Sequence, residues 1–347
     1  MSKKISILIF GSIVSFVSLA HAAVDASEPP SAVHSESAAR LERATNSESA
    51  VTPPVPTDLE NSDSQPKIPL IQVFTGVPET VLDTLQYSFM KERIPAWATI
   101  LATTAVLYQY DQDIYDGVTR VGRRWNIGNG DGTRTVISGG GLNLLRVPTN
   151  LGSSLYFLGD GWTHSLIAVG FFGTGYFTNN NRAYNTGVEL VHGLIISTLF
   201  SQVLKRSFGR EDPGQSTMVR GAWRPFPSIH SYGENTAMYD AFPSGHVMTA
   251  TLTFTIIEQN YPEYACFLYP LEGVWLAALS LEMINNGVHW ASDYPLGIAL
   301  GYVVGKMSTR LAHPNRDPLK KETTASTWSF YPSLGSDGSR LNAMYTF

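Results

Sequence analysis

The sequence predicts an all-α protein, built as a bundle of about six core helices and followed by a short C-terminal β-hairpin. Two observations predict the bundle. Apolar side chains recur at intervals of three and four residues, and loops containing Gly, Pro and Asn separate the apolar stretches. A third observation predicts the hairpin, because an aromatic segment at Trp328 and an apolar segment at 341–347 flank Asp337-Gly338, a common turn pair.

Six stretches of the chain carry the helical pattern. They are 96–110, 151–176, 188–205, 246–259, 271–284 and 296–311. Polar residues interrupt them, such as Glu189 and His192 in the third and Lys306 and Arg310 in the last, and the mean hydropathy of the chain is −0.04. We therefore expect buried core helices rather than membrane spans, and the composition also allows peripheral membrane contact.

The two ends of the chain differ in composition from its centre. Residues 1–22 resemble a secretory signal peptide, with Lys3 and Lys4 before an apolar stretch and small residues at Ala20 and Ala22. Residues 23–66 form a leader rich in Ser, Glu and Pro, with too few large apolar side chains to fold, so we expect it to be disordered. We expect the helical domain at 67–315 and the extension with the hairpin at 316–347.

The cysteine content indicates the cellular compartment of the protein, and the charge limits the classes of partner that it can bind. The single cysteine, Cys266, can form no intramolecular disulfide, which fits export to the periplasm of a Gram-negative bacterium better than a disulfide-rich secreted domain. We expect a buried structural thiol there, because the surrounding stretch is apolar. The formal net charge of −5, without a basic stripe, argues against nucleic acid as a partner.

The sequence Pro-Ser-Gly-His at 243–246 indicates an anion site. Ser244 is a good helix N-cap, and Gly245 lets a ligand approach the backbone closely. The free amides of the first helical turn would face an anion, and His246 would reach it from the same turn. The alternative is an ordinary capped helix with an exposed histidine.

A second histidine, His289, has Asp293 four residues downstream. Residues four apart share a face on a helix, and they can also meet on a turn. Asp293 could then accept the Nδ1 proton of His289 and leave Nε2 free to attack a phosphoryl group, as the aspartate of a serine-protease triad orients its histidine. The alternative is that Asp293 is a plain N-cap.

The stretch at 188–205 ends in a cationic segment that runs to Pro213. Lys205 and Arg210 in this segment could clamp a phosphate. The helix dipole alone also favours cations at a helix C-terminus, so the segment taken by itself does not decide between the two interpretations.

Together the three segments resemble the type 2 phosphatidic acid phosphatase (PAP2) superfamily, which shares its fold with vanadium haloperoxidases and bacterial class A acid phosphatases. That family carries Lys-x6-Arg-Pro, then Pro-Ser-Gly-His, then Ser-Arg-x5-His-x3-Asp. The order and approximate separations match here over about 150–310, and the second motif is complete. The resemblance implies a PAP2/haloperoxidase-like helical bundle.

The resemblance also implies a mechanism that uses no metal or cofactor. His289 would be the nucleophile that forms a phosphohistidine, Asp293 would orient it, and His246 would protonate the leaving oxygen. Cationic side chains and backbone amides would stabilise the transferring phosphoryl group. The residues implied to hold the phosphate oxygens are Lys205, Ser244 and Gly245.

The chain departs from the family at both motif arginines. Asp212 stands where the first motif has Arg, and Glu282 and Met283 stand where the third has Ser-Arg. Loss of one such donor typically costs about 100- to 1000-fold in rate. We expect Arg210 to be the first replacement. The further candidates are Arg206, Arg220 and Arg224.

These observations predict an exported phosphatase that hydrolyses a phosphomonoester or a diphosphate, with lipid-linked phosphates among its candidate substrates. The alternative is a catalytically weak or inactive relative that binds a phosphorylated small molecule, a lipid headgroup or a protein partner. A vanadate-dependent haloperoxidase is disfavoured, because vanadate in those sites depends on the same arginines. The position of the Arg210 guanidinium distinguishes the first two hypotheses.

Overall fold

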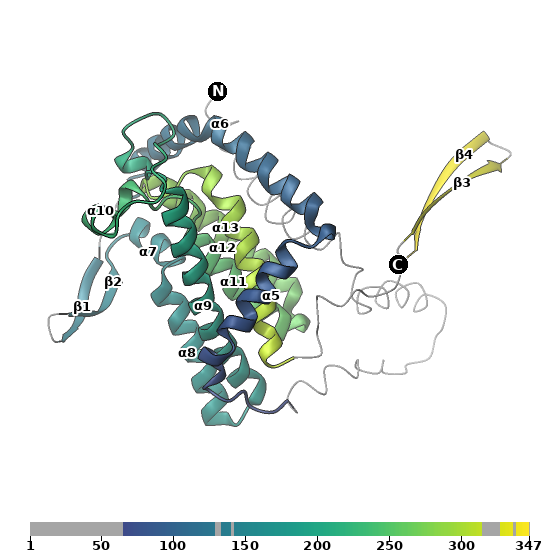
Figure 1. The fold of residues 1–347 in the computed structure, drawn as a ribbon, viewed down its shortest axis with the longest axis horizontal. Helices are drawn as coiled ribbons and strands as arrows, with labels where there is room; N and C mark the ends of the chain where they lie inside the picture. The colour runs from purple at the N-terminus through teal and green to yellow at the C-terminus, as the bar shows by residue number, and fades with distance from the viewer. Residues whose placement is uncertain (1–64, 129–132, 140–141, 314–326, 336–337, 347) are drawn as a thin grey trace.

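The computed structural model describes residues 65–128, 133–139, 142–313, 327–335 and 338–346 (Figure 1). The predicted signal peptide at 1–22 and nearly all of the predicted leader at 23–66 lie outside the described residues. The predicted domain boundaries therefore stay predictions.

The described residues form the predicted all-α bundle. Helices α9, α11 and α13 run through its centre, α8 packs on α9, α12 packs on α11, and α5 lies against α13 (Figure 1). The helices are α4 (Gln72–Thr75), α5 (Val77–Ser88), α6 (Ile94–Arg124), α7 (Leu151–Phe157), α8 (Gly161–Thr178), α9 (Asn181–Phe208), α10 (Ile229–Glu234), α11 (Gly245–Asn260), α12 (Ala265–Asn285) and α13 (Tyr294–Ser308).

Two buried clusters hold the bundle together. One joins α11, α12 and α13 through residues such as Val247, Leu279 and Ile298. The other joins α8, α9, α11 and α13, with Leu252 and Val304 at its centre. Burying a side chain of this size stabilises the fold by about 1.5–3 kcal/mol. The helix ends that carry the site motifs are therefore anchored by a packed core.

The sequence predicted one helix at 151–176, and the structure divides it into α7 and α8. The side chain of Asp160 accepts a hydrogen bond from the Trp162 amide at 2.8 Å and so starts a new helix. Gly159 lies in the break, where a Cβ would be 2.7 Å from Leu279 and 2.8 Å from the Cβ of His246. The break thus lets the chain approach the site histidine closely.

The hairpin predicted in the C-terminal extension is confirmed. Strands β3 (Thr327–Gly335) and β4 (Gly338–Thr346) pair antiparallel, with Thr327 opposite Thr346 and Gly335 opposite Gly338. The sequence did not predict a second antiparallel pair, formed by β1 (Thr133–Gly139) and β2 (Leu142–Pro148). Helices α5 and α10 were also not predicted.

The prediction of buried core helices is correct for α11 and α13 but wrong for the outer faces of α8 and α12. On α8 the exposed residues include Trp162, Leu166, Val169, Tyr176 and Phe177, and on α12 they include Phe267, Tyr269, Leu271 and Val274. Cys266, expected to be buried, is also exposed, because it lies in the first turn of α12. Two helical segments, Asn181–Phe208 and Pro262–Asn285, are long and apolar enough to cross a membrane, which by itself is weak support for a span.

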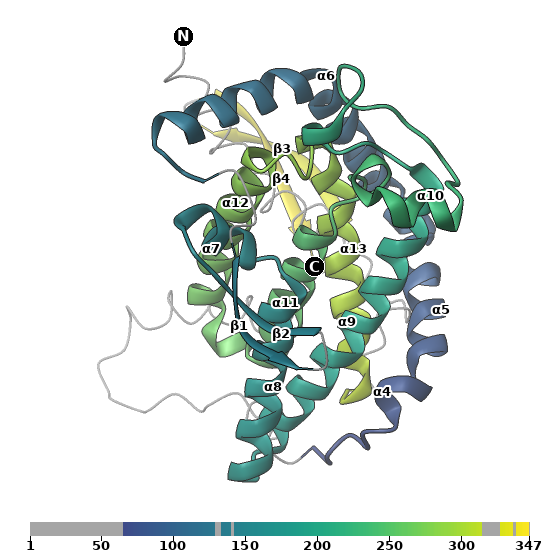
Figure 2. The same cartoon turned by 90° about the vertical axis from the view of Figure 1, so that its left-hand side faces the viewer.

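Both views place α6 and α10 at the same end of the bundle (Figure 1, Figure 2). Helix α9 ends and helix α11 begins on either side of the loop that carries α10. The three motif segments are the end of α9, the start of α11 and the turn before α13. This end of the molecule therefore brings together the three segments that the sequence singled out.

Candidate active site

The Pro-Ser-Gly-His turn is fixed by its neighbours on both sides. Ser244 is the N-cap of α11, where its Oγ accepts from the Val247 amide at 3.4 Å, and its own amide donates to the Asp293 carbonyl at 3.0 Å. A Cβ on Gly245 would lie 3.2 Å from the Ser201 Oγ and 3.9 Å from the Lys205 Nζ. The glycine therefore lets α11 start directly against the end of α9.

His246 and His289 face each other across the site. The Nδ1 atom of His246 lies 3.3 Å from the Nε2 atom of His289, and the Tyr156 ring packs edge-on against His246 with centroids 4.9 Å apart. The Nδ1 atom of His289 is 2.7 Å from the Ala241 carbonyl oxygen. A carbonyl can only accept, so Nδ1 of His289 carries the proton and Nε2 presents a lone pair to His246.

Both histidines are neutral at pH 7. Burial, followed by the charges of Lys205 and His246, lowers the pKa of His289 well below its ordinary value. Burial, then Lys205 and His164, lowers the pKa of His246 to about 3. A neutral His289 whose Nε2 carries a lone pair and no proton is the form that acts as a nucleophile.

Asp293 does not make the predicted hydrogen bond to His289. Its Oδ2 lies 3.8 Å from the Nδ1 atom of His289 and instead accepts from the Trp290 amide at 2.6 Å. Its Oδ1 accepts from Arg210 at 2.5 Å. With both oxygens engaged, the Ala241 carbonyl holds His289 in its tautomer. Asp293 occupies the N-cap position of α13, but its side chain makes no cap bond there.

The terminal nitrogens of Arg210, expected to clamp a phosphate, bond to groups of the protein instead, while its Nε has no hydrogen-bond partner among the described residues. One terminal nitrogen donates to the Ser292 Oγ at 2.7 Å and to Asp293, and the other donates to Asp111 at 2.7 Å and to the Arg220 carbonyl at 2.9 Å. These bonds use all four terminal N–H groups. The guanidinium is fully buried, with its carbon 5.0–5.2 Å from the ring centroids of Tyr108, Trp223 and Trp290.

The charges around Arg210 form a closed buried set. Burial lowers the pKa of Arg210, but Asp293 and Asp111 outweigh it and raise the pKa. Burial raises the pKa of Asp293 to about 7, against the opposing effect of Arg210. A buried cation between two buried carboxylates is strongly held, because removal of either partner leaves an uncompensated charge.

Asp111 of α6 is a site-region residue that the sequence analysis missed. Its carboxylate accepts from the Ser292 amide at 3.0 Å and from the Ser292 Oγ at 2.5 Å, in addition to Arg210. Asp111 is 1% exposed, whereas Asp113 on the same helix is exposed. A carboxylate inside a long helix with an apolar face was the available signal, since buried acids are almost always paired.

Among the cations that the structure describes, Lys205 has the largest effect on the pKa of both site histidines, and it is paired with an acid. Its Nζ donates to Asp240 at 3.0 Å, and its charge lowers the pKa of both site histidines. Burial, then Asp240, raises the pKa of Asp212 to about 9, while Lys205 opposes them. The sequence analysis did not single out Asp240, which stands directly before the Ala241 carbonyl that orients His289.

The remaining candidate arginines have partners elsewhere in the described part of the chain. Arg206 donates to Gln202 and lies over the Tyr232 ring. Arg220 donates to Gln109, and Arg224 donates to Glu211. None of them takes the place of a motif arginine beside the histidines in the contacts that the structure describes.

The side chains of the other two departures from the motif contact residues other than the two histidines. Glu282 lies near Gly152, where a glycine Cβ would be 2.7 Å from its Oε1, and it contacts Asn285. Burial raises the pKa of Glu282 to about 7. Met283 is fully buried in the cluster that joins α11 and α12.

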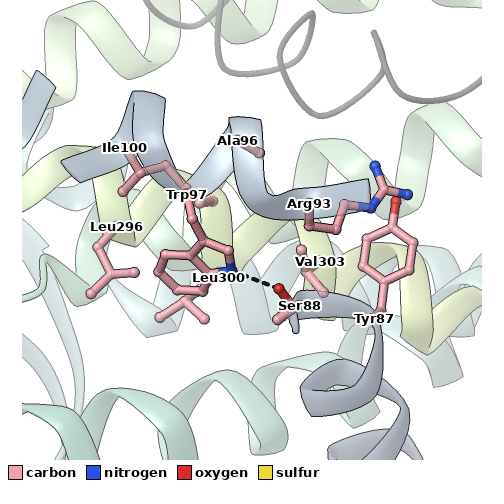
Figure 3. A pocket seen from close by; sticks show the side chains of 10 residues that line it. Tyr87, Ser88, Arg93, Ala96, Trp97, Ile100, Leu296, Leu300 and Val303 are labelled. Atoms are coloured by element: carbon pink, nitrogen blue, oxygen red, sulfur yellow. Dashed lines mark hydrogen bonds between the residues drawn. The ribbon is translucent and has the colours of Figure 1, made fainter. Parts of the chain in front are cut away.

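A separate pocket lies between α5, α6 and α13 (Figure 3). Leu296, Leu300 and Val303 of α13 line one side, and Trp97 donates to the Ser88 carbonyl at its edge. Its volume of about 30 Å³ holds about two waters and no phosphoester. The described residues also contain no group of three or more His, Cys, Asp or Glu side chains that could hold a metal ion.

Comparisons with known proteins agree with the motifs. A model of the PAP2 superfamily matches residues 186–317. The crystal structure of the first transmembrane PAP2 type phosphatidylglycerolphosphate phosphatase from Bacillus subtilis is 14% identical and has a TM-score of 0.38, covering 73% of this chain and 98% of its own. A search of curated proteins finds no significant match. The matched segment contains Lys205, His246, His289 and Asp293, and over this segment the chain is similar to the PAP2 superfamily.

Proposed function

We propose that the protein is an exported phosphatase that hydrolyses a phosphomonoester or a diphosphate through a phosphohistidine on His289. The observation that carries the proposal is the buried histidine pair. The Ala241 carbonyl fixes the Nδ1 proton of His289, and Nε2 points at His246 across 3.3 Å. Lys205 lies close enough to shift the pKa of both rings, so an anion bound between the histidines meets a positive charge.

In the first step, Nε2 of His289 attacks phosphorus, the N–P bond forms, and the bond from phosphorus to the leaving oxygen breaks. His246 gives its proton to that oxygen. A bound phosphoryl anion raises the pKa of His246, which opposes burial and Lys205 and lets the ring carry this proton. The phosphorylated His289 ring is cationic, and Asp293, with Oδ2 at 3.8 Å from Nδ1, stabilises it at close range.

In the second step, His246 takes a proton from water, the oxygen attacks phosphorus, and the N–P bond breaks. Inorganic phosphate leaves, and His289 returns to its neutral form. Lys205, the Ser244 hydroxyl and the Gly245 amide supply the charge stabilisation, so the mechanism uses no metal. Activity should therefore survive dialysis against a chelator such as EDTA.

The decisive variant is His289→Ala, measured by phosphate release from p-nitrophenyl phosphate, a lipid phosphomonoester and a lipid diphosphate. We expect a loss of more than about 1000-fold, because the nucleophile is removed. His230→Ala is the matched control, since His230 is exposed and pairs with Glu234. A rapid quench in alkaline detergent should trap an alkali-stable, acid-labile phosphoryl label on wild-type protein only. Unchanged turnover by His289→Ala would remove the mechanism.

Exposed apolar stripes support contact with a membrane, and hence a lipid-linked substrate. Trp162, Leu166 and Val169 on α8 follow helical spacing, as do Phe267, Leu271 and Val274 on α12, and all six are exposed. Exposed apolar patches mark interaction or membrane sites. Flotation with vesicles of anionic phospholipid tests this contact, and Leu166→Glu with Leu271→Glu should reduce it.

A second candidate is a module that binds a phosphorylated ligand without turnover. The observation that favours it is the fate of Arg210, whose terminal N–H groups are all used by groups of the protein itself. Phosphate binding that persists in His289→Ala, together with no phosphate release by wild-type protein, would select this module over the phosphatase.

A further inference from the structure

Asp212 occupies the position of the first motif arginine, directly before Pro213, and its side chain lies in the site. It is 7% exposed, and its Oδ1 is buried without a hydrogen-bond partner among the described residues. Its charge interacts with Asp240, Lys205 and Asp293. A buried polar atom without a partner in a native structure calls for a ligand or solvent to complete it.

The backbone holds Asp212 in this place. Its amide donates to the Ala237 carbonyl at 2.9 Å, and its carbonyl accepts from the Gln215 amide at 3.1 Å. Pro213 follows at the start of a short 3-10 turn, which restricts the chain further. The carboxyl group is therefore positioned by the fold and does not depend on a side-chain bond for its place.

An ionised Asp212 would oppose an anion at this site. Lys205 is already bonded to Asp240, so it would have to balance a second carboxylate and a phosphoryl group in addition to its present partner. Burial and Asp240 raise the pKa of Asp212 to about 9, and a bound phosphoryl anion raises it further. A neutral carboxyl group, unlike a carboxylate, has an O–H donor.

We propose that Asp212 binds the phosphoryl group as a neutral carboxylic acid whose O–H donates to a phosphoryl oxygen, in the place where the family motif has an arginine. This inference rests on the proposed phosphoryl site at His289. It makes Asp212 a substrate-binding residue, and it makes anion binding depend on a proton that an arginine would not need.

The other groups that face Asp212 do not produce the same pH dependence between pH 7 and 10. The groups are Lys205 from α9, Tyr232 from α10, Asp240 from the loop before α11, and Asp293 from the turn before α13; Arg206 of α9 acts on Tyr232. Burial, then Asp240, raises the pKa of Tyr232 to about 12, above this range, and Asp293 titrates near 7, at its lower edge. Lys205 and Asp240 are present in wild type and in both variants below.

The experiment measures binding of inorganic phosphate by calorimetry from pH 7 to 10 in wild type, Asp212→Asn and Asp212→Ala. Wild-type Kd should rise by about tenfold per pH unit above about pH 9, as Asp212 ionises. Asp212→Asn keeps an N–H donor at every pH, so its Kd should lack this rise and stay within about threefold of wild type at pH 7. Asp212→Ala should bind about 10- to 100-fold more weakly at pH 7.

The inference is overturned if Asp212→Asn shows the same alkaline rise as wild type, or if Asp212→Ala binds as tightly as wild type. Absence of phosphate binding by wild-type protein overturns it as well. Binding that follows the expected pattern without turnover keeps the Asp212 inference and removes the phosphatase. Turnover that requires His289 but is unchanged by substitution of Asp212 keeps the phosphatase and removes the Asp212 inference. The near-isosteric Asn variant, with its fold checked by circular dichroism, keeps the test valid if Asp212→Ala is unstable.

Discussion

The site has two halves that are held in different ways. The histidine half, His246 and His289, is positioned by backbone contacts, such as the bond from His289 Nδ1 to the Ala241 carbonyl. The cationic half, Lys205 and Arg210, is positioned by charge pairing, with Lys205 bonded to Asp240 and Arg210 bonded to Asp111 and Asp293. The comparison shows that backbone contacts hold the motif histidines in the predicted arrangement. The position of a long cationic side chain depends instead on which carboxylates lie within its reach.

The largest expected effect comes from removing Arg210. In Arg210→Met, Asp111 and Asp293 remain buried without their cation, and we expect the free energy of unfolding to fall by about 3–5 kcal/mol. Urea denaturation at pH 7 measures it. Arg220→Met is the control, because Arg220 is partly exposed and bonds to Gln109, so its loss should cost about 0–1 kcal/mol. Equal stability of the two variants would contradict the pairing account.

Removing Lys205 tests the cationic half where it meets the histidines. We expect Lys205→Met to lower kcat/KM for a phosphomonoester by about 100- to 1000-fold, because it removes the cation with the largest effect on both site histidines. Removal also relieves a downward effect on the pKa of His246, so NMR titration should find that pKa higher than in wild type. Lys306→Met on α13, distant in sequence and stacked near Tyr87, should leave both quantities unchanged. An unchanged rate in Lys205→Met would show that the backbone amides suffice.

Asp111 lies outside the segment that matches the family, and it links Arg210 of the cationic half to Ser292 in the turn after His289. Asp111→Asn keeps the shape but leaves Arg210 with a weaker partner and removes an acceptor for Ser292, so we expect a loss of about 1–3 kcal/mol in unfolding free energy. The turn at 291–293 should loosen, which hydrogen exchange of the Ser292 amide would detect. Asp113→Asn, at an exposed position of the same helix, is the control and should change neither quantity.

Much of the fold and the histidine half could be predicted from the sequence. The bundle followed from helical spacing, and the hairpin β3–β4 followed from its Asp-Gly pair. His246 and His289 could be placed together through the resemblance to the PAP2 superfamily, because the chain keeps both Pro-Ser-Gly-His and His-x3-Asp. The division between α7 and α8 depends on the N-cap at Asp160. The sequence analysis missed this cap because apolar residues surround it on both sides.

The cationic half could not be predicted, because its partners are distant in sequence. Arg210 and Asp111 are 99 residues apart, and no local pattern joins them. Asp293 carries the motif position of the orienting acid, yet its oxygens bond to Arg210 and to the Trp290 amide. The direct bond to His289 was a reasonable expectation from spacing, but spacing does not reveal which of several neighbours a carboxylate will accept from.

The smallest expected effect distinguishes the roles of Glu282 and Asp212, the two acids that replace other residues of the family motifs. Burial raises the pKa of Glu282 to about 7 from an ordinary 4.5, so the folded protein keeps a proton there that the unfolded chain releases. The free energy of unfolding therefore falls as pH rises from about 4.5 through 7. Glu282→Gln should remove this part of the fall, on the order of 1 kcal/mol between pH 5 and 8.

Glu263→Gln is the control of opposite sign. Although burial raises the pKa of Glu263, the bond from Arg182 outweighs it and the pKa is lowered. Its contribution is thus present above pH 4.5 and lost in acid, and the Gln variant should be unchanged in its slope from pH 5 to 8. Because Glu282 faces Gly152 and Asn285, Glu282→Gln should also leave phosphate binding unchanged, whereas Asp212→Asn should alter its pH dependence. If Glu282→Gln altered that pH dependence instead, then Glu282, and not Asp212, would be the acid that contacts the bound phosphate.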